Sequence, residues 1–180
     1  MSLQQIQRFI EGEKTNLSFL DKKIPGAERF KYYDFIWSPL AIKSGIYNMP
    51  DSDGIWKNIE NLAKNILQPV YNNFGPIKII SGFRINELNK LFKGRLHSNH
   101  LNGTSVDFVP FHENVSVFNV LEFIEKELEY RELVAEYFPM GWIHASFQFQ
   151  NNSMHLRLKD VEHDYERVSI DYIKRFYGDL

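Results

Sequence analysis

Two histidines and one aspartate, set in a loop and in two strand-like runs, constrain the fold of this chain more than any other feature. His100 lies in a polar loop, Asp107 follows between the apolar Val106 and Phe108, and His144 lies in the run Trp-Ile-His-Ala-Ser. An aspartate in such surroundings is costly to bury without a cation or hydrogen-bond donors. Two imidazoles and one carboxylate are a ligand set for catalytic zinc that leaves a fourth position open to water. We therefore expect a fold that gathers one loop and two strands around a metal.

The hydrophobic pattern predicts helices and strands along the whole chain. Apolar residues three and four positions apart predict helices from about 54 to 72 and, after a cap at Ser116, from 117 to 128. Ser38 and Pro39 predict the start of a short helix. Shorter apolar runs predict a central strand at 76–80, further strands at 106–109, 132–137 and 142–149, an edge strand at 156–158 and a closing helix at 170–177.

Composition restricts the partners and the metal ligands. The chain has 180 residues, enough for one domain with a real core, and a formal net charge of −2. That charge gives no general attraction to nucleic acid or to an anionic membrane. Apolar runs fall short of the roughly 20 residues that span a bilayer, so we expect no membrane insertion. Because the chain contains no cysteine, any zinc must be held by histidine and carboxylate.

The first 30 residues are polar and mixed in charge, and we interpret them as an N-terminal arm with a short helix packed on the domain, in preference to a partner-binding arm. Residues 1–9 lack the apolar segment of a signal peptide. We therefore expect the protein to be cytoplasmic at synthesis and to reach a cell wall only if it is exported or carried by a virion. The sequence leaves the oligomeric state open, together with the roles of residues 1–30 and 150–180.

The pattern Ser-x-His-x-x-Gly-x-x-x-Asp at 98–107, followed by Trp-Ile-His-x-Ser at 142–146, resembles the M15 family of zinc peptidases. These include D-Ala-D-Ala carboxypeptidases and L-alanyl-D-glutamate endopeptidases of bacteria and phage. Ser-Gly-Phe-Arg at 81–84 adds to a resemblance that runs over 32–149. It implies an α+β domain at 31–180 of the hedgehog/DD-peptidase type, in which a small antiparallel sheet carries zinc and helices lie on one face.

The resemblance also assigns roles to single residues. It implies that His100, Asp107 and His144 bind Zn²⁺ and that Arg84 lies near the substrate, although an arginine there is also compatible with a surface ion pair. We predict that Ser98 and Trp142 also bind substrate, although Ser98 could also hydrogen-bond a zinc ligand. We expect four further histidines to lie outside the site, mostly at the surface: His97, His112, His155 and His163.

The resemblance leaves the identity of the general base open. Well-studied members of the family carry an acidic residue three positions before the last histidine ligand, and this chain has Gly141 there. Glu136, on the preceding strand, is the nearest substitute. Whether it faces the zinc depends on strand register, since a slip of one residue reverses its side.

Two main functions follow from the resemblance. The first is a zinc-dependent peptidase that hydrolyses peptide bonds in peptidoglycan stem peptides, as a carboxypeptidase or as an endopeptidase. The alternative, favoured by Gly141, is a catalytically silent zinc-binding structural or binding protein of phage or prophage origin. A weaker third hypothesis is an M15-like interaction domain that has also lost the metal.

Overall fold

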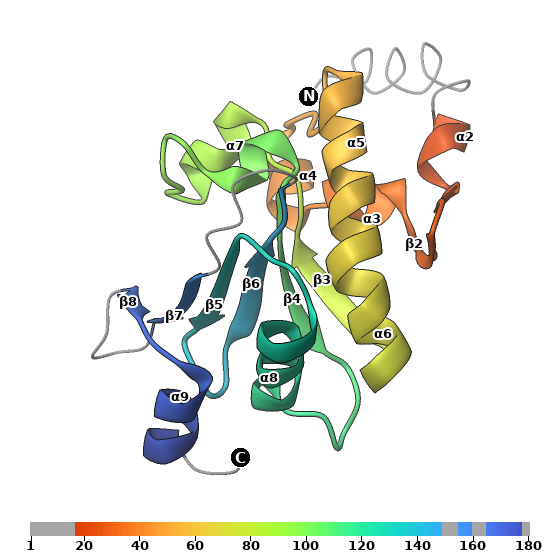
Figure 1. Cartoon of the computed structure of the whole chain (residues 1–180). Coiled ribbons are helices and arrows are strands. Elements are labelled where there is room, and N and C mark those ends of the chain that lie inside the picture. The colour runs from red at the N-terminus through yellow and green to blue at the C-terminus, as the bar shows by residue number, and fades with distance from the viewer. Residues whose placement is uncertain (1–16, 149–154, 160–164, 178–180) are drawn as a thin grey trace.

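A six-stranded sheet organises the molecule (Figure 1), and the strand order is β3-β4-β6-β5-β7-β8. The computed structural model describes residues 17–148, 155–159 and 165–177. All neighbouring strands pair antiparallel except β5 and β7, which are parallel. The strands are β3 (Ile77–Ser81), β4 (Ser105–Pro110), β5 (Glu132–Glu136), β6 (Trp142–Ser146), β7 (His155–Lys159) and β8 (Glu166–Arg167). The α+β architecture with a small, mainly antiparallel sheet is confirmed.

Two predicted strand positions in this sheet are wrong. The strand expected to be central, β3, lies at one edge of the described sheet and pairs with β4 alone. The burial along β3 alternates, which fits this position: Ile77 and Ile79 are half-buried while Lys78 and Ile80 are exposed. The strand expected at the edge, β7, lies between β5 and the two-residue β8.

The helices begin and end close to their predicted positions. The longest helical rod runs from α5 through a π-helical turn, η1, into α6, and Pro69 lies in the first turn of α6. Proline lacks the N–H that an α-helix needs and its ring clashes with the carbonyl four residues earlier, so a wider turn before it relieves the clash. The helices are α2 (Leu17–Leu20), α3 (Tyr32–Ile36), α4 (Pro39–Ser44), α5 (Asp53–Leu62), η1 (Ala63–Leu67), α6 (Gln68–Phe74), α7 (Asn86–Leu91), the 3₁₀ helix η2 (Asn99–Asn102), α8 (Val117–Glu127) and α9 (Ile170–Tyr177).

Both predicted helix caps are present. The Ser38 hydroxyl accepts a hydrogen bond from the backbone N–H of Ala41 at 3.3 Å, and Ser116 caps α8 in the same way through Asn119. Within the described residues, none of the helices has the length and apolar character that a bilayer crossing requires.

The sheet has one apolar face and one polar face, because successive side chains of a strand point to opposite sides. The long helical rod, α8 and α9 bury the apolar face in one core. The sheet contributes Val106, Phe108, Leu133, Ala135, Ile143, Ala145, Leu156 and Leu158 to that core, each at most 4% exposed. With the apolar face covered, the opposite face of the same strands is left for polar side chains.

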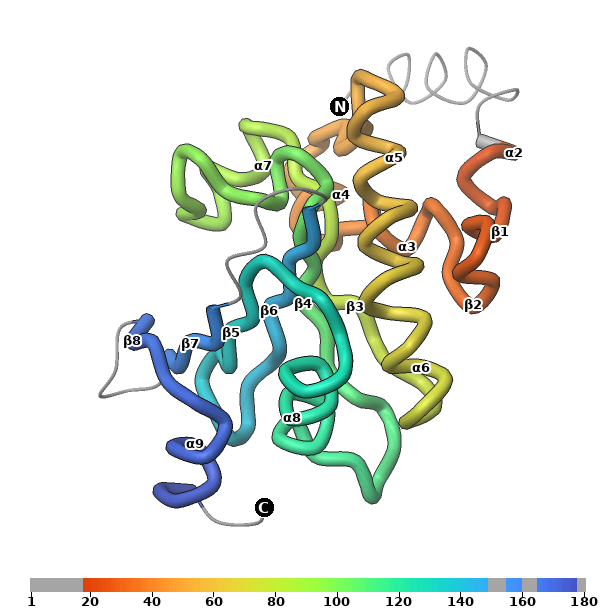
Figure 2. The backbone as a smooth tube through the Cα atoms, viewed as in Figure 1, coloured from red at the N-terminus to blue at the C-terminus, as the bar shows by residue number. Residues whose placement is uncertain are grey.

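The described part of the N-terminal segment packs beside the helical rod (Figure 2). After α2, the strands β1 (Lys23–Ile24) and β2 (Ala27–Lys31) form a small hairpin, and β2 contacts η1 and α6. Leu20, Ile24 and Phe30 are buried there. Residues 1–16 of the predicted arm lie outside the described residues.

One buried amide fixes the loop that leaves β3. The Asn48 side chain donates to the carbonyl oxygens of Ile36 and Phe83, both at 2.8 Å, and accepts from the N–H of Ile85 at 2.9 Å. Asn48 therefore holds the backbone on both sides of Arg84.

We expect Asn48→Ala to lower the free energy of unfolding by about 3 kcal/mol, because it leaves three buried backbone groups without their partner. Urea denaturation monitored by fluorescence measures the loss. Asn58→Ala is the control, since its amide makes an exposed bond to the carbonyl of Asn102. Equal losses in the two variants would contradict the role assigned to Asn48.

Candidate metal centre

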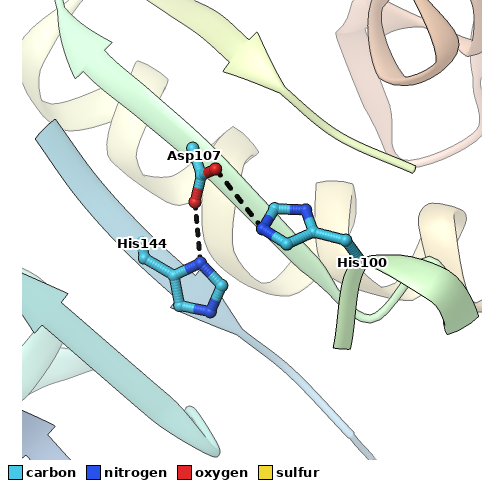
Figure 3. A group of neighbouring side chains, drawn as sticks. All are labelled: His100, Asp107 and His144. Carbon is cyan, nitrogen blue, oxygen red and sulfur yellow. Dashed lines mark hydrogen bonds and ion pairs between the residues drawn. The ribbon is translucent and has the colours of Figure 1, made fainter. Parts of the chain in front are cut away.

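Three elements bring the predicted ligands together (Figure 3). Asp107 on β4 lies directly opposite His144 on β6, so the two side chains share the polar face of the sheet. His100 enters from η2. The Asp107 Oδ1 to His144 Nδ1 distance is 2.7 Å, and the Asp107 Oδ2 to His100 Nε2 distance is 3.3 Å.

The geometry of these atoms fits a zinc ion. The three donor atoms lie within 4.8 Å of one another, in the one such group of metal-ligand side chains that the described residues contain. Four ligands placed tetrahedrally at about 2.1 Å from zinc lie roughly 3.4 Å apart. The His100, Asp107 and His144 atoms thus need only small movements to share one ion. Two imidazole nitrogens and one carboxylate oxygen are also donors that zinc accepts.

Burial and charge put two of the three groups in the state that a metal requires. Burial alone would raise the pKa of Asp107, but the two neighbouring imidazoles outweigh it and hold that pKa well below its usual range. Burial lowers the pKa of His100, so this imidazole is neutral. Burial also opposes the charged form of His144, yet its bond to Asp107 raises the pKa. Metal binding therefore competes with the proton that Asp107 favours on His144.

The backbone at the end of β3 orients His100. The Gly82 carbonyl lies 2.7 Å from His100 Nδ1 and accepts a hydrogen bond from its N–H, which leaves Nε2 toward Asp107. Glycine is required at 82, because a Cβ there would overlap the backbone of Phe35. The second nitrogen of His100 is thus held by a backbone carbonyl, a partner that the sequence did not reveal, and not by Ser98.

Arg84 lies inside the centre and is not a surface ion pair. Its Nη2 is 2.7 Å from Asp107 Oδ2, and its Nε donates to the hydroxyl of Ser81 at 2.8 Å. The guanidinium also lies 4.5 Å from the ring centroid of Phe92. Its predicted contact with substrate stays a prediction.

The three predicted metal ligands line a cleft of about 610 Å³. The predicted substrate-binding residues Ser98 and Trp142 line it as well, and so does Glu136. Exposed His97 lies at the same cleft, whereas His112, which is exposed, and His155, which is half-buried in β7, do not line it. His163 lies outside the described residues.

The register places Glu136 on the side of the metal ligands. Val134 is opposite His144 and Glu136 is opposite Trp142, so the carboxylate is on the polar face. Burial raises the pKa of Glu136 above its ordinary value of 4.5, even though Lys159 and Tyr165 oppose the rise. A catalytic role for this group stays a prediction.

The chain has a steric reason for glycine at 141. A Cβ at this position would overlap the carbonyl oxygen of Glu136. Any larger residue would require the turn between β5 and β6 to move.

Several cleft residues were missed from the sequence, among them Arg95, Lys159 and Tyr165. The alternation of Arg157 and Lys159 along β7 indicated a polar face, but nothing in the local sequence showed that β7 pairs with β5.

A family model described as Peptidase M15 matches residues 28–146, about two-thirds of the chain. The chain therefore belongs to the peptidase M15 family. No curated protein matches it.

We expect His100→Ala and His144→Ala each to weaken zinc binding by more than the roughly 10–100-fold that loss of a supporting hydrogen bond costs. Calorimetric titration of zinc into chelator-treated protein measures the affinity. His112→Ala, at an exposed loop position, is the matched control. Undiminished affinity in either ligand variant would contradict the ligand set.

We expect Glu136→Gln to raise the melting temperature of chelator-treated protein at pH 7 relative to the parent. A carboxyl whose pKa is raised on folding destabilises the folded state as pH rises above its unfolded pKa of 4.5. Glutamine has no such penalty. Melting curves from pH 4 to 7 should show the advantage of the variant growing with pH, and a constant difference would contradict the raised pKa.

Proposed function

We propose that this member of the peptidase M15 family is a zinc-dependent peptidase that hydrolyses peptide bonds in peptidoglycan stem peptides. The observation that carries the proposal is the convergence of His100, Asp107 and His144 in a cleft that also contains Arg84 and Glu136. When bound, zinc would supply a Lewis acid for the scissile carbonyl and lower the pKa of a water molecule.

Glu136 is the group that would move the proton. Its carboxylate would accept a proton from the attacking water and return it to the leaving amine. Burial supports this role, because a carboxyl with a raised pKa exchanges protons more readily near neutral pH.

Arg84, Ser98 and Trp142 would bind the peptide. The bonds of Arg84 to Asp107 and Ser81 use Nη2 and Nε, and the forked guanidinium has further donors for a carbonyl or a carboxylate. Trp142, half-buried beside His144, gives the cleft an aromatic wall.

Gly141 is the observation that favours the second candidate, a zinc-binding structural or binding protein of phage or prophage origin. Such a protein would keep the metal without hydrolysing any wall peptide. The peptidase is the better supported function, because Glu136 supplies a carboxylate on the correct face of the sheet.

Mass spectrometry of purified stem peptides, incubated with zinc-loaded protein with and without chelator, tests the activity. We expect new fragments that the chelator abolishes, and their masses separate carboxypeptidase from endopeptidase cleavage. Zinc-bound protein that releases no fragment from several wall chemotypes would favour the binding protein.

Glu136→Gln should keep zinc and lower turnover by roughly 10²–10⁴-fold, the usual contribution of a general base. Glu127→Gln is the matched control, because Glu127 is exposed on α8 and does not line the cleft. Turnover that survives in Glu136→Gln would remove this residue from the mechanism.

A further inference from the structure

Two side chains of the cleft come from beyond residue 146, where the family match ends. Parallel pairing sets Lys159 on β7 beside Glu136 on β5, so both side chains lie on the polar face. The Lys159 Nζ to Glu136 Oε2 distance is 3.8 Å. The C-terminal part of the chain therefore brings a cation to the proposed base.

The Lys159 ammonium is held from several directions. It donates to the hydroxyl of Tyr165 at 3.0 Å and lies 4.4 Å from the centroid of that ring. The Tyr137 ring centroid is 5.2 Å away, and the Tyr137 N–H donates to the Lys159 carbonyl at 2.6 Å. A lysine with these partners has little freedom to leave Glu136.

Tyr165 has an unusual backbone for a bulky residue. Its φ is +59°, in the left-handed region, which costs on the order of 1 kcal/mol for a side chain of this kind. Backbone strain of this type is found at functional sites, where surrounding contacts enforce it. Here the Tyr165 hydroxyl accepts a hydrogen bond from the Lys159 ammonium that lies beside Glu136, and the Arg95 guanidinium lies 4.7 Å from the ring centroid.

We propose that Lys159 and Tyr165 are positioning residues that hold the Glu136 carboxylate in the cleft of this peptidase. The proposal rests on the proposed function for its catalytic consequence. A purely structural role, closing the sheet beside β8, would affect stability but leave the reactivity of Glu136 unchanged.

Four groups on neighbouring elements shift the pKa of Glu136, and the direction of each shift decides what the test should show. Lys159, Tyr165 and His144 favour the charged carboxylate, whereas Asp107 and burial oppose it. Removing the Lys159 ammonium or the Tyr165 hydroxyl takes away a group that lowers the pKa of Glu136. That pKa should therefore rise, so that Glu136 takes up its proton at higher pH.

The kinetic test compares Tyr165→Phe and Lys159→Met with two controls, Tyr172→Phe and Lys126→Met. Tyr172 and Lys126 lie on α9 and α8 and do not line the cleft. We expect kcat to fall about tenfold or more in each cleft variant, a part of the roughly 10²–10⁴-fold contribution of a general base. KM should stay within about twofold, and the acidic limb of the pH profile should move to higher pH, while both controls match the parent.

A second measurement decides the proposal without activity. In zinc-loaded protein with ¹³C-labelled glutamate, the side-chain carboxyl signal that Glu136→Gln removes is assigned to Glu136 and titrated in the parent and in both cleft variants. We expect its midpoint to rise in each variant. An unchanged midpoint in both would overturn the positioning role even if the parent is an active peptidase. Absence of turnover from the parent would refute the proposed function, and the titration alone would then decide the positioning of this carboxylate.

Discussion

A charged aspartate on the inner part of a sheet is the constraint on which this structure depends. Asp107 is 7% exposed, and its charge is stabilised by His144 and Arg84, with the His100 imidazole beside it. An isolated carboxylate at this depth would be strongly unfavourable. The elements around it are arranged to supply those partners: β6 pairs in register, η2 delivers an imidazole, and the loop after β3 is fixed so that the guanidinium reaches the carboxylate.

Because side chains alternate between the two faces of each strand, the residues that stabilise the core differ from those that line the cleft. One set of positions on β4, β5, β6 and β7 forms the core with the helices, and the alternate set forms the cleft. Each strand therefore carries both roles without sharing a side chain between them. The same alternation makes register decisive, because Glu136 belongs to the cleft only through its pairing opposite Trp142.

Local sequence patterns predicted the features that depend on residues close together in the chain. The grouping of His100, Asp107 and His144, the long helical rod, the caps at Ser38 and Ser116 and the closing helix were all visible in spacing and residue type. The order of strands was not, because pairing partners are chosen by contacts between distant segments. The edge position of β3 and the parallel pairing of β7 were therefore missed, and with them Lys159 and Tyr165. The role of Asn48 was not predicted either, since the three backbone groups that its side chain hydrogen-bonds lie up to 37 residues away in the sequence.

The tight turn between β5 and β6 has a consequence for how this site can evolve. The backbone at Gly141 lies against the carbonyl of Glu136, so no single codon change can place an acidic side chain there without rebuilding the turn. An acidic side chain could enter at that position only if the backbone of the turn moved away from this carbonyl. The present turn therefore leaves room for a carboxylate on β5 and excludes one just before β6.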